Sequence, residues 1–223
     1  MGLKSWLRSK LGMAEFEAEQ TKRLKAWEYA QINDWDLLEA DPFKDEARDA
    51  ARLIETSPEA AFDRLLALAK QGSLYSMNFV AWCLVVGTGA TEDVDEAMAW
   101  YQRAYEGGSD RALLEFGAFL VWKGQTVEAE QVYEAGWQRA FVPAVYRLIR
   151  MRLKPSLPLR TRLTWKPSLE WAAAAGHPAA RHLLSRYLLR GWFGVLGIPR
   201  GVGLAYAHVT GVLRDDEDLP IVA

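Results

Sequence analysis

A pattern that recurs along the chain is the feature that most constrains its fold. The clearest copy runs from Asp93 to Gly124 and has the form of two helices joined by a glycine turn. Its first half spaces small and apolar side chains three and four residues apart, which gathers them on one helical stripe: Ala97, Trp100, Tyr101, Ala104 and Gly108. Its second half does the same with Ala112, Phe116, Gly117 and Leu120. The pattern predicts a pair of helices packed through small residues.

Capping signals fix where these two helices begin and end. Asp93 is placed to cap the first helix, and Glu96, three residues later, completes a capping box. Gly107 and Gly108 end that helix where a left-handed residue is needed, and Ser109 is placed to cap the second helix.

Three further copies lie at offsets of 36 residues before and of 32 and then 36 residues after the clearest copy. Their matching positions are Ala61, Leu65, Gly72, Ala81 and Leu84, then Ala129, Tyr133, Gly136, Ala140 and Ala144, then Leu169, Ala172, Gly176, Ala180 and Leu184. One such pair cannot bury its stripe alone, so neighbouring pairs must stack and share a continuous core.

The junction ahead of the clearest copy resembles that of Sel1-like repeats. From Leu84 to Gly108 the chain reads LVVGTGATEDVDEAMAWYQRAYEGG, and the family pattern is Y-x-x-G-x-G-V, a short acidic spacer, then A-x-x-W-Y-x-K-A-A-x-x-G. The chain departs from the pattern at Leu84, Ala90, Arg103 and Tyr105. The resemblance covers roughly residues 57–210 and is weakest in the third copy, where Gly136 and Trp137 replace the alanine pair.

This resemblance implies an all-α fold, an α/α solenoid with a right-handed superhelix built from about four helix pairs related to tetratricopeptide repeats. The domains expected are an amphipathic element at 1–12, capping helices at 13–56, the solenoid at 57–210 and an acidic tail at 211–223. The resemblance also implies an adaptor in protein complexes without catalysis.

Residues that carry catalysis are sparse in this chain. Cys83 is the only cysteine, which excludes an internal disulfide, fits a reducing compartment and, in its apolar surroundings, favours a buried inert thiol. His177 and His182 are five residues apart, which sets them about 140° apart on a helix, unlike a metal-binding pair. We therefore predict no enzyme activity and no catalytic, cofactor or metal residue.

The net charge of −2 hides a strong division along the chain. Residues 1–138 hold 14 Lys and Arg against 24 Asp and Glu, whereas residues 139–200 hold 12 basic residues against Glu170 alone. Opposed fields of this kind steer association and orient partners.

The basic segment supplies one set of candidate partner-binding residues: Arg150, Arg152, Arg160, Arg162 and Trp165. An acidic protein surface is the favoured partner of these residues. The acidic half of a second copy of the chain is one such surface, which would lead to self-association. Phosphate backbones and anionic lipids are chemical alternatives. A pI near 6 and the lack of a known motif make nucleic acid the weaker alternative. Arginines that only solvate the helices remain a further interpretation.

The sequence also predicts which residues face a groove and which tryptophans are buried. If the first helix of each pair lines the concave groove, the ligand-facing residues are Met98, Gln102, Arg103, Glu134 and Gln138. Core packing is predicted for Trp82, Trp100, Trp122, Trp137 and Trp171, which lie in apolar helical sequence. Exposure near a terminus or loop is predicted for Trp6, Trp165 and Trp192.

Two segments outside the repeats keep alternative interpretations. Residues 1–12 set Leu3, Trp6, Leu7 and Leu11 opposite basic residues, so they form a helix that packs back on the solenoid, lies on an anionic membrane or enters a partner's groove. The stretch 151–166, interrupted by two prolines, is either a binding insertion or a spacer.

The sequence thus predicts a bacterial, cytoplasmic scaffold that binds a peptide or protein surface, with a position at the membrane periphery as an alternative location. The alternative is a peripheral membrane or nucleic-acid binder that uses residues 139–200 and the N-terminal helix.

Overall fold

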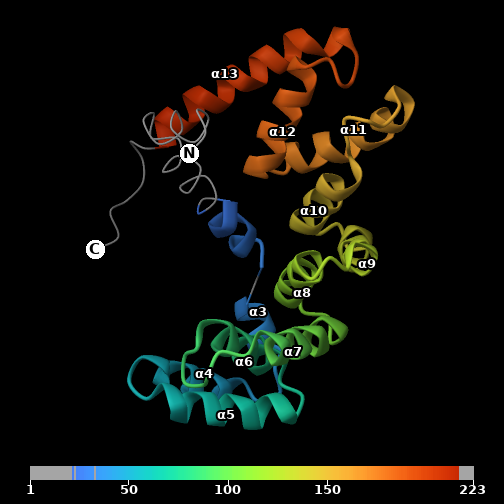
Figure 1. Cartoon of the computed structure of the whole chain (residues 1–223). Helices are drawn as coiled ribbons and strands as arrows, with labels where there is room; N and C mark the ends of the chain where they lie inside the picture. Colours follow the sequence, from blue (N-terminus) through green and yellow to red (C-terminus); the bar gives the residue numbers. More distant parts are fainter. Residues whose placement is uncertain (1–21, 23, 33, 216–223) are drawn as a thin grey trace, which may run out of the picture. The chain divides into compact units, whose positions relative to one another are not determined.

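The chain folds into helices joined by short loops (Figure 1). The structure is a computed structural model, and it describes residues 22, 24–32 and 34–215. Residues 24–30 are helical. The later elements are α3 (Asp34–Glu39), α4 (Lys44–Arg52), η1 (Leu53–Glu55), α5 (Pro58–Lys70), α6 (Leu74–Val86), α7 (Val94–Glu106), α8 (Asp110–Trp122), α9 (Thr126–Gln138), α10 (Val142–Arg152), α11 (Leu159–Ala174), α12 (Pro178–Leu189), η2 (Val195–Gly197) and α13 (Ile198–Asp215). No strand occurs among the described residues, so the all-α prediction is confirmed.

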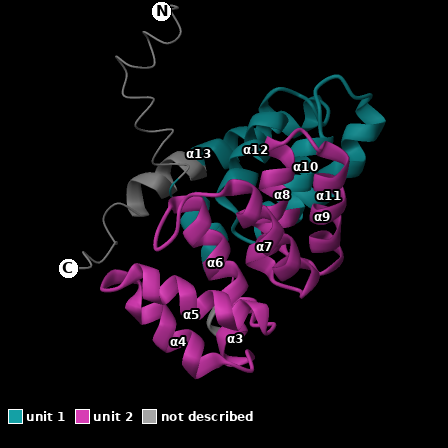
Figure 2. Ribbon diagram, turned by 60° about the horizontal axis from the view of Figure 1, so that its bottom comes forward, with its two compact units in different colours: residues 1–30, 145–223 teal, residues 31–144 magenta. Residues whose placement is uncertain are grey.

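The helices form two compact units, coloured separately in Figure 2. Unit 2 is residues 31–144, in which each helix from α4 to α8 packs on the next one along the chain and α3 packs on α6. Unit 1 joins the described part of residues 1–30 to residues 145–215, in which α11 packs on α12 and α12 on α13. Sequential packing of helix hairpins is the order expected of an α/α solenoid.

The segments outside the clearest repeats have different outcomes. The amphipathic element predicted at 1–12 lies outside the described residues. The stretch predicted to break at its prolines does so, because α10 ends at Arg152 and α11 begins at Leu159. None of the described helices combines the length and apolar character needed to cross a bilayer.

Small residues on the repeat stripe let neighbouring helices approach closely. Ala97, Ala104 and Ala112 are fully buried in the clearest copy. A Cβ on Gly117 of α8 would lie 2.5 Å from the Tyr133 ring of α9, and a Cβ on Gly136 would lie 2.3 Å from the Ala144 Cβ. Larger side chains at these places would push the helices apart, so the stripe sets the spacing of the pairs.

The residue that caps the second helix of a pair also reaches back toward an earlier part of the chain. Ser73, Ser109 and His177 occupy this position, and each side chain accepts a hydrogen bond from the backbone N–H three residues later. The Ser109 hydroxyl oxygen also accepts from the Asn78 amide at 2.9 Å. The His177 ring lies 4.2 Å from the Tyr146 ring, and Tyr146 precedes its cap by the same 31 residues as Asn78. These caps therefore tie successive pairs together.

The third copy departs from the others at the residue before this cap. Gly72, Gly108 and Gly176 have φ values of +104°, +98° and +94°, whereas the matching residue of the third copy is Ala140 with φ +56°. An alanine in the left-handed region is strained because its Cβ crowds the backbone, and glycine avoids that strain.

We expect Ala140→Gly to raise the free energy of unfolding by about 1 kcal/mol, because it removes that strain. Ala67→Gly is the matched control, since Ala67 is an exposed alanine inside α5, where glycine should instead lower stability by about 1 kcal/mol. Urea unfolding followed by circular dichroism measures both changes. Destabilisation by both substitutions would contradict the strain at Ala140.

Candidate functional site

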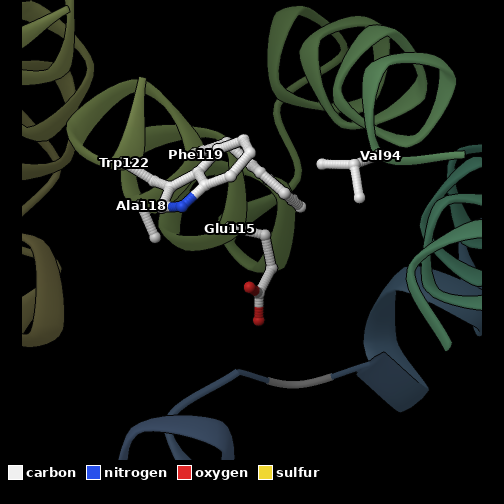
Figure 3. A pocket seen from close by; sticks show the side chains of 5 residues that line it. All are labelled: Val94, Glu115, Ala118, Phe119 and Trp122. Atoms are coloured by element: carbon white, nitrogen blue, oxygen red, sulfur yellow. The ribbon is translucent and has the colours of Figure 1, made fainter. Parts of the chain in front are cut away.

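An open hollow of about 340 Å³ lies on the second helix of the clearest repeat, within unit 2 (Figure 3). Glu115, Ala118, Phe119 and Trp122 of α8 line it, together with Val94 at the start of α7. The α8 residues follow one another at steps of three and four, so they share one side of the helix. Figure 3 shows Val94 and Trp122 at opposite ends of the hollow, with Glu115 between them.

Trp122 is the most accessible aromatic side chain at this hollow. It is the last residue of α8, and 69% of its surface is exposed. The Lys123 ammonium lies 5.7 Å from the centre of its ring and also pairs with Asp95 at the start of α7. The indole is therefore positioned at the surface with one face still open to contact.

This exposure corrects part of the prediction for the tryptophans. Core packing is confirmed for Trp100, which is 4% exposed, but it is wrong for Trp82, Trp122 and Trp171, which are 39%, 69% and 42% exposed. Trp171 lies on α11, the first helix of its pair. For Trp82 and Trp122, the physical reason is that second helices such as α6 are apolar on nearly every side. Periodicity therefore cannot distinguish the side that meets a neighbouring helix from the side that meets solvent.

The residues predicted to face a groove lie on the first helices, α7 and α9, and none of them lines the hollow. Gln102 donates to the Glu106 carboxylate at 2.9 Å, and the Arg103 guanidinium lies 4.6 Å from the Trp100 ring. Contact between a ligand and Met98, Gln102, Arg103, Glu134 or Gln138 stays a prediction. The hollow was missed because all of its lining residues except Val94 are contributed by the second helix.

The basic candidates all lie in unit 1, and the structure places several of them against aromatic rings. The Arg152 guanidinium lies 5.7 Å from the Trp165 ring, and Arg162 lies 5.9 Å from the Trp192 ring. Arg150 donates to the Tyr146 hydroxyl at 3.4 Å. Arg160 is exposed near the start of α11. Their part in binding also stays a prediction.

A buried ion pair that the sequence did not predict ties the helix at 24–30 to the rest of unit 1. Glu28 is 2% exposed and accepts two hydrogen bonds from the Arg147 guanidinium of α10, at 2.6 and 3.3 Å. The fully buried His177 places its Nε2 atom 3.6 Å from the same carboxylate. The partners are more than 100 residues apart in sequence, which is why no local pattern indicated them.

The electrostatics of this cluster favour the ionised carboxylate. Burial raises the pKa of Glu28, but the neighbouring His177 ring and Arg147 guanidinium outweigh burial and hold that pKa below its ordinary value. The His177 Nδ1 atom is occupied, because it accepts the Ala180 N–H at the start of α12. Trp27 and Tyr146 pack on the same histidine ring, at 4.8 and 4.2 Å. The Glu28 and Arg147 side chains of this cluster are paired with each other, which suits a tether.

Two further observations concern the chemistry that the described residues can perform. Cys83 is buried, and burial raises the pKa of its thiol to about 11, so the thiol stays protonated at neutral pH. The prediction of a buried thiol there is confirmed. Among the described residues, no group of His, Cys, Asp and Glu is arranged to hold a metal ion.

We expect Glu28→Gln to lower the free energy of unfolding at neutral pH by about 2 kcal/mol, because the charge that faces Arg147 is removed. The folded pKa of Glu28 is below its ordinary value of 4.5. Its contribution is therefore complete above pH 4.5 and is lost as the pH falls through the folded pKa. Urea unfolding at a series of pH values measures the gap between the two proteins, which should close on acidification.

Glu92→Gln is the control, since Glu92 is exposed in a loop of unit 2 and its removal should leave stability nearly unchanged at every pH. A gap for Glu28→Gln that stays constant with pH would contradict the ion pair.

Comparison with known proteins gives structural neighbours only. No protein-family model matches the sequence, and the search of curated proteins gave no match. A solved structure of a Sel1 repeat protein from Oxalobacter formigenes aligns over 75% of each chain with 16% identity and a TM-score of 0.58. A protective antigen from uropathogenic Escherichia coli strains, which displays an SLR fold, aligns over 74% of this chain and 43% of its own, with 16% identity and a TM-score of 0.45. The resemblance to Sel1-like repeats is thus confirmed at the level of the fold: the chain has the Sel1 repeat fold, an α/α solenoid of paired helices.

Proposed function

We propose that this protein is a non-enzymatic scaffold that binds a peptide or protein segment at the hollow on α8. The observation that carries the proposal is the exposed indole of Trp122 beside an apolar depression formed by Val94, Ala118 and Phe119. Exposed tryptophans next to a depression are typical of the residues that dominate binding energy at protein interfaces. The Sel1 repeat fold supports a role in protein interaction.

The size of the apolar contribution is adequate for specific binding. An indole side chain buries roughly 150–250 Å² of surface, and apolar burial contributes about 25 cal/mol per Å². Covering the exposed part of Trp122 therefore contributes about 3 kcal/mol, or more than a hundredfold in affinity. The rest of the ligand would contact the neighbouring exposed residues Val121 and Val127.

The lining also favours binding over catalysis. Among the described residues that line the hollow, Glu115 is the only charged one, whereas active sites usually gather several converging polar groups. Residues 31–144 hold 9 Lys and Arg against 20 Asp and Glu, so the field around the hollow is acidic. The ligand that fits best carries a large apolar side chain flanked by basic residues.

We place this role in the cytoplasm of a bacterium. The single cysteine is a buried, protonated thiol, which fits a reducing compartment, and the Sel1 repeat protein with a similar fold comes from a bacterium. The alternative of a membrane or nucleic-acid binder gains no support from the fold comparisons.

Selection of random peptides displayed on phage, with the full chain as bait, tests the proposal without knowledge of the native partner. We expect enriched peptides that carry an aromatic or large aliphatic residue next to Lys or Arg. Trp122→Ala should weaken their binding by about thirtyfold or more, because the main anchor is lost. Fluorescence anisotropy with the synthetic peptides measures the change.

Trp171→Ala is the matched control, because Trp171 is a partly exposed tryptophan in unit 1, and it should leave these affinities unchanged. Thermal unfolding should show little change for Trp122→Ala, whose side chain is mostly exposed. Enriched peptides that bind Trp122→Ala as tightly as the wild type would refute the proposed site.

A further inference from the structure

Among the described side chains of unit 1, the arginines greatly outnumber the carboxylates. The acidic side chains described in this unit are Glu28 and Glu170. Glu28 is paired with Arg147, and Glu170 is paired with Arg200 at 2.5 Å and with Lys166 at 3.9 Å. The remaining arginines of α11 and α12 therefore present a positive surface to solvent.

Two of these arginines lie at the two ends of a pair of stacked aromatic rings. Arg162 belongs to α11, Arg186 and Tyr187 belong to α12, and Trp192 lies in the loop after α12. The Tyr187 and Trp192 rings are stacked, with their centres 4.1 Å apart and an interplanar angle of 21°. The Arg162 guanidinium lies 5.9 Å from the Trp192 ring, and the Arg186 guanidinium lies 5.7 Å from the Tyr187 ring. We call these four residues the arginine–aromatic stack.

Packing on rings orients a guanidinium without using its N–H donors. Neither Arg162 nor Arg186 forms an ion pair with a described residue, and the Nε atom of Arg162 is shut off from solvent without a hydrogen-bond partner. The two cations are thus held in place by contacts other than hydrogen bonds to acids. A carboxylate that arrives at the surface finds donors whose ordering has already been achieved within the fold.

Apolar side chains lie beside these cations on the same helices. Leu159 and Leu163 are exposed on α11, three residues before and one residue after Arg162, and Leu189 is exposed near the end of α12. Phosphate backbones offer no apolar groups to cover leucines. A peptide that combines acidic and aliphatic side chains satisfies both parts of the surface.

We propose that the surface formed by α11, α12 and the arginine–aromatic stack is a second docking site, which takes an acidic segment of a partner protein. Carboxylates of the partner pair with Arg162 and Arg186, and its aliphatic side chains cover Leu159 and Leu163. The charge preference is opposite to that of the hollow on α8, so the protein joins two chemically different partners. Figure 2 shows α11 and α12 in unit 1 and α8 in unit 2.

A short fluorescein-labelled peptide of alternating Glu and Leu is a direct probe of this site on the full chain. We expect saturable binding by fluorescence anisotropy, and we expect the double variant Arg162→Gln/Arg186→Gln to weaken it at least about tenfold, since two charge-assisted contacts are lost. Arg64→Gln, a single substitution of the same type at an exposed residue of unit 2, should leave the affinity within about twofold of wild type. Circular dichroism checks that every variant is folded.

Four results would overturn the proposal. They are equal binding by the double variant, an equal loss with Arg64→Gln, equal affinity for a peptide with Gln in place of Glu, and tighter binding of a mixed-sequence oligonucleotide than of the peptide. Trp122→Ala should retain affinity for the Glu–Leu peptide. This proposal can therefore fail while the hollow on α8 stands, and the reverse also holds.

Discussion

Close approach of helices at alanine and glycine is the interaction on which the rest of this structure depends. Where Gly117 meets Tyr133 and Gly136 meets Ala144, there is no room for another methyl group. The capping residues at the start of the second helices add a polar contact, as Ser109 does with Asn78. Within unit 2, these contacts give each hairpin a fixed place against the next one. The larger side chains outside the contacts are left for other purposes.

The exposed side chains divide into two kinds of surface. Unit 2 offers an acidic field and an apolar hollow edged by Trp122, whereas unit 1 offers arginines oriented by aromatic rings. Neither surface is needed to close the core, because Trp122 and the leucines beside Arg162 are exposed in the folded chain. Exposed apolar side chains that gather in one place are typical of interaction sites.

Much of the fold could be predicted from the sequence because its determinants are local and repeated. The caps at Asp93 and Ser109 and the buried stripe around Ala104 lie within one pattern of about 36 residues, so each copy supports the others. The third copy is the weakest match to the pattern in sequence, and it is also strained in the structure. Its Ala140 has the left-handed backbone conformation that glycine has in the other copies.

The candidate site was less accessible to sequence reasoning, for two physical reasons. Trp122 belongs to an apolar helix whose open side has no distinct periodicity, so its exposure depends on how neighbouring pairs stack. The Glu28–Arg147 pair and the Arg162–Trp192 contact join residues far apart in sequence. The charge division did indicate the basic surface, but the ring contacts that orient its arginines appear only in three dimensions.

The central claim is that the helix pairs are a preformed scaffold and that ligands bind to side chains exposed on it. Amide hydrogen exchange measured by mass spectrometry, on the full chain free and saturated with a peptide selected on the hollow, tests this claim most directly. We expect slow exchange in α5 to α9 in both states, with added protection confined to α8 and the start of α7. Rapid exchange throughout these helices in the free protein, followed by protection of the whole unit on binding, would contradict it.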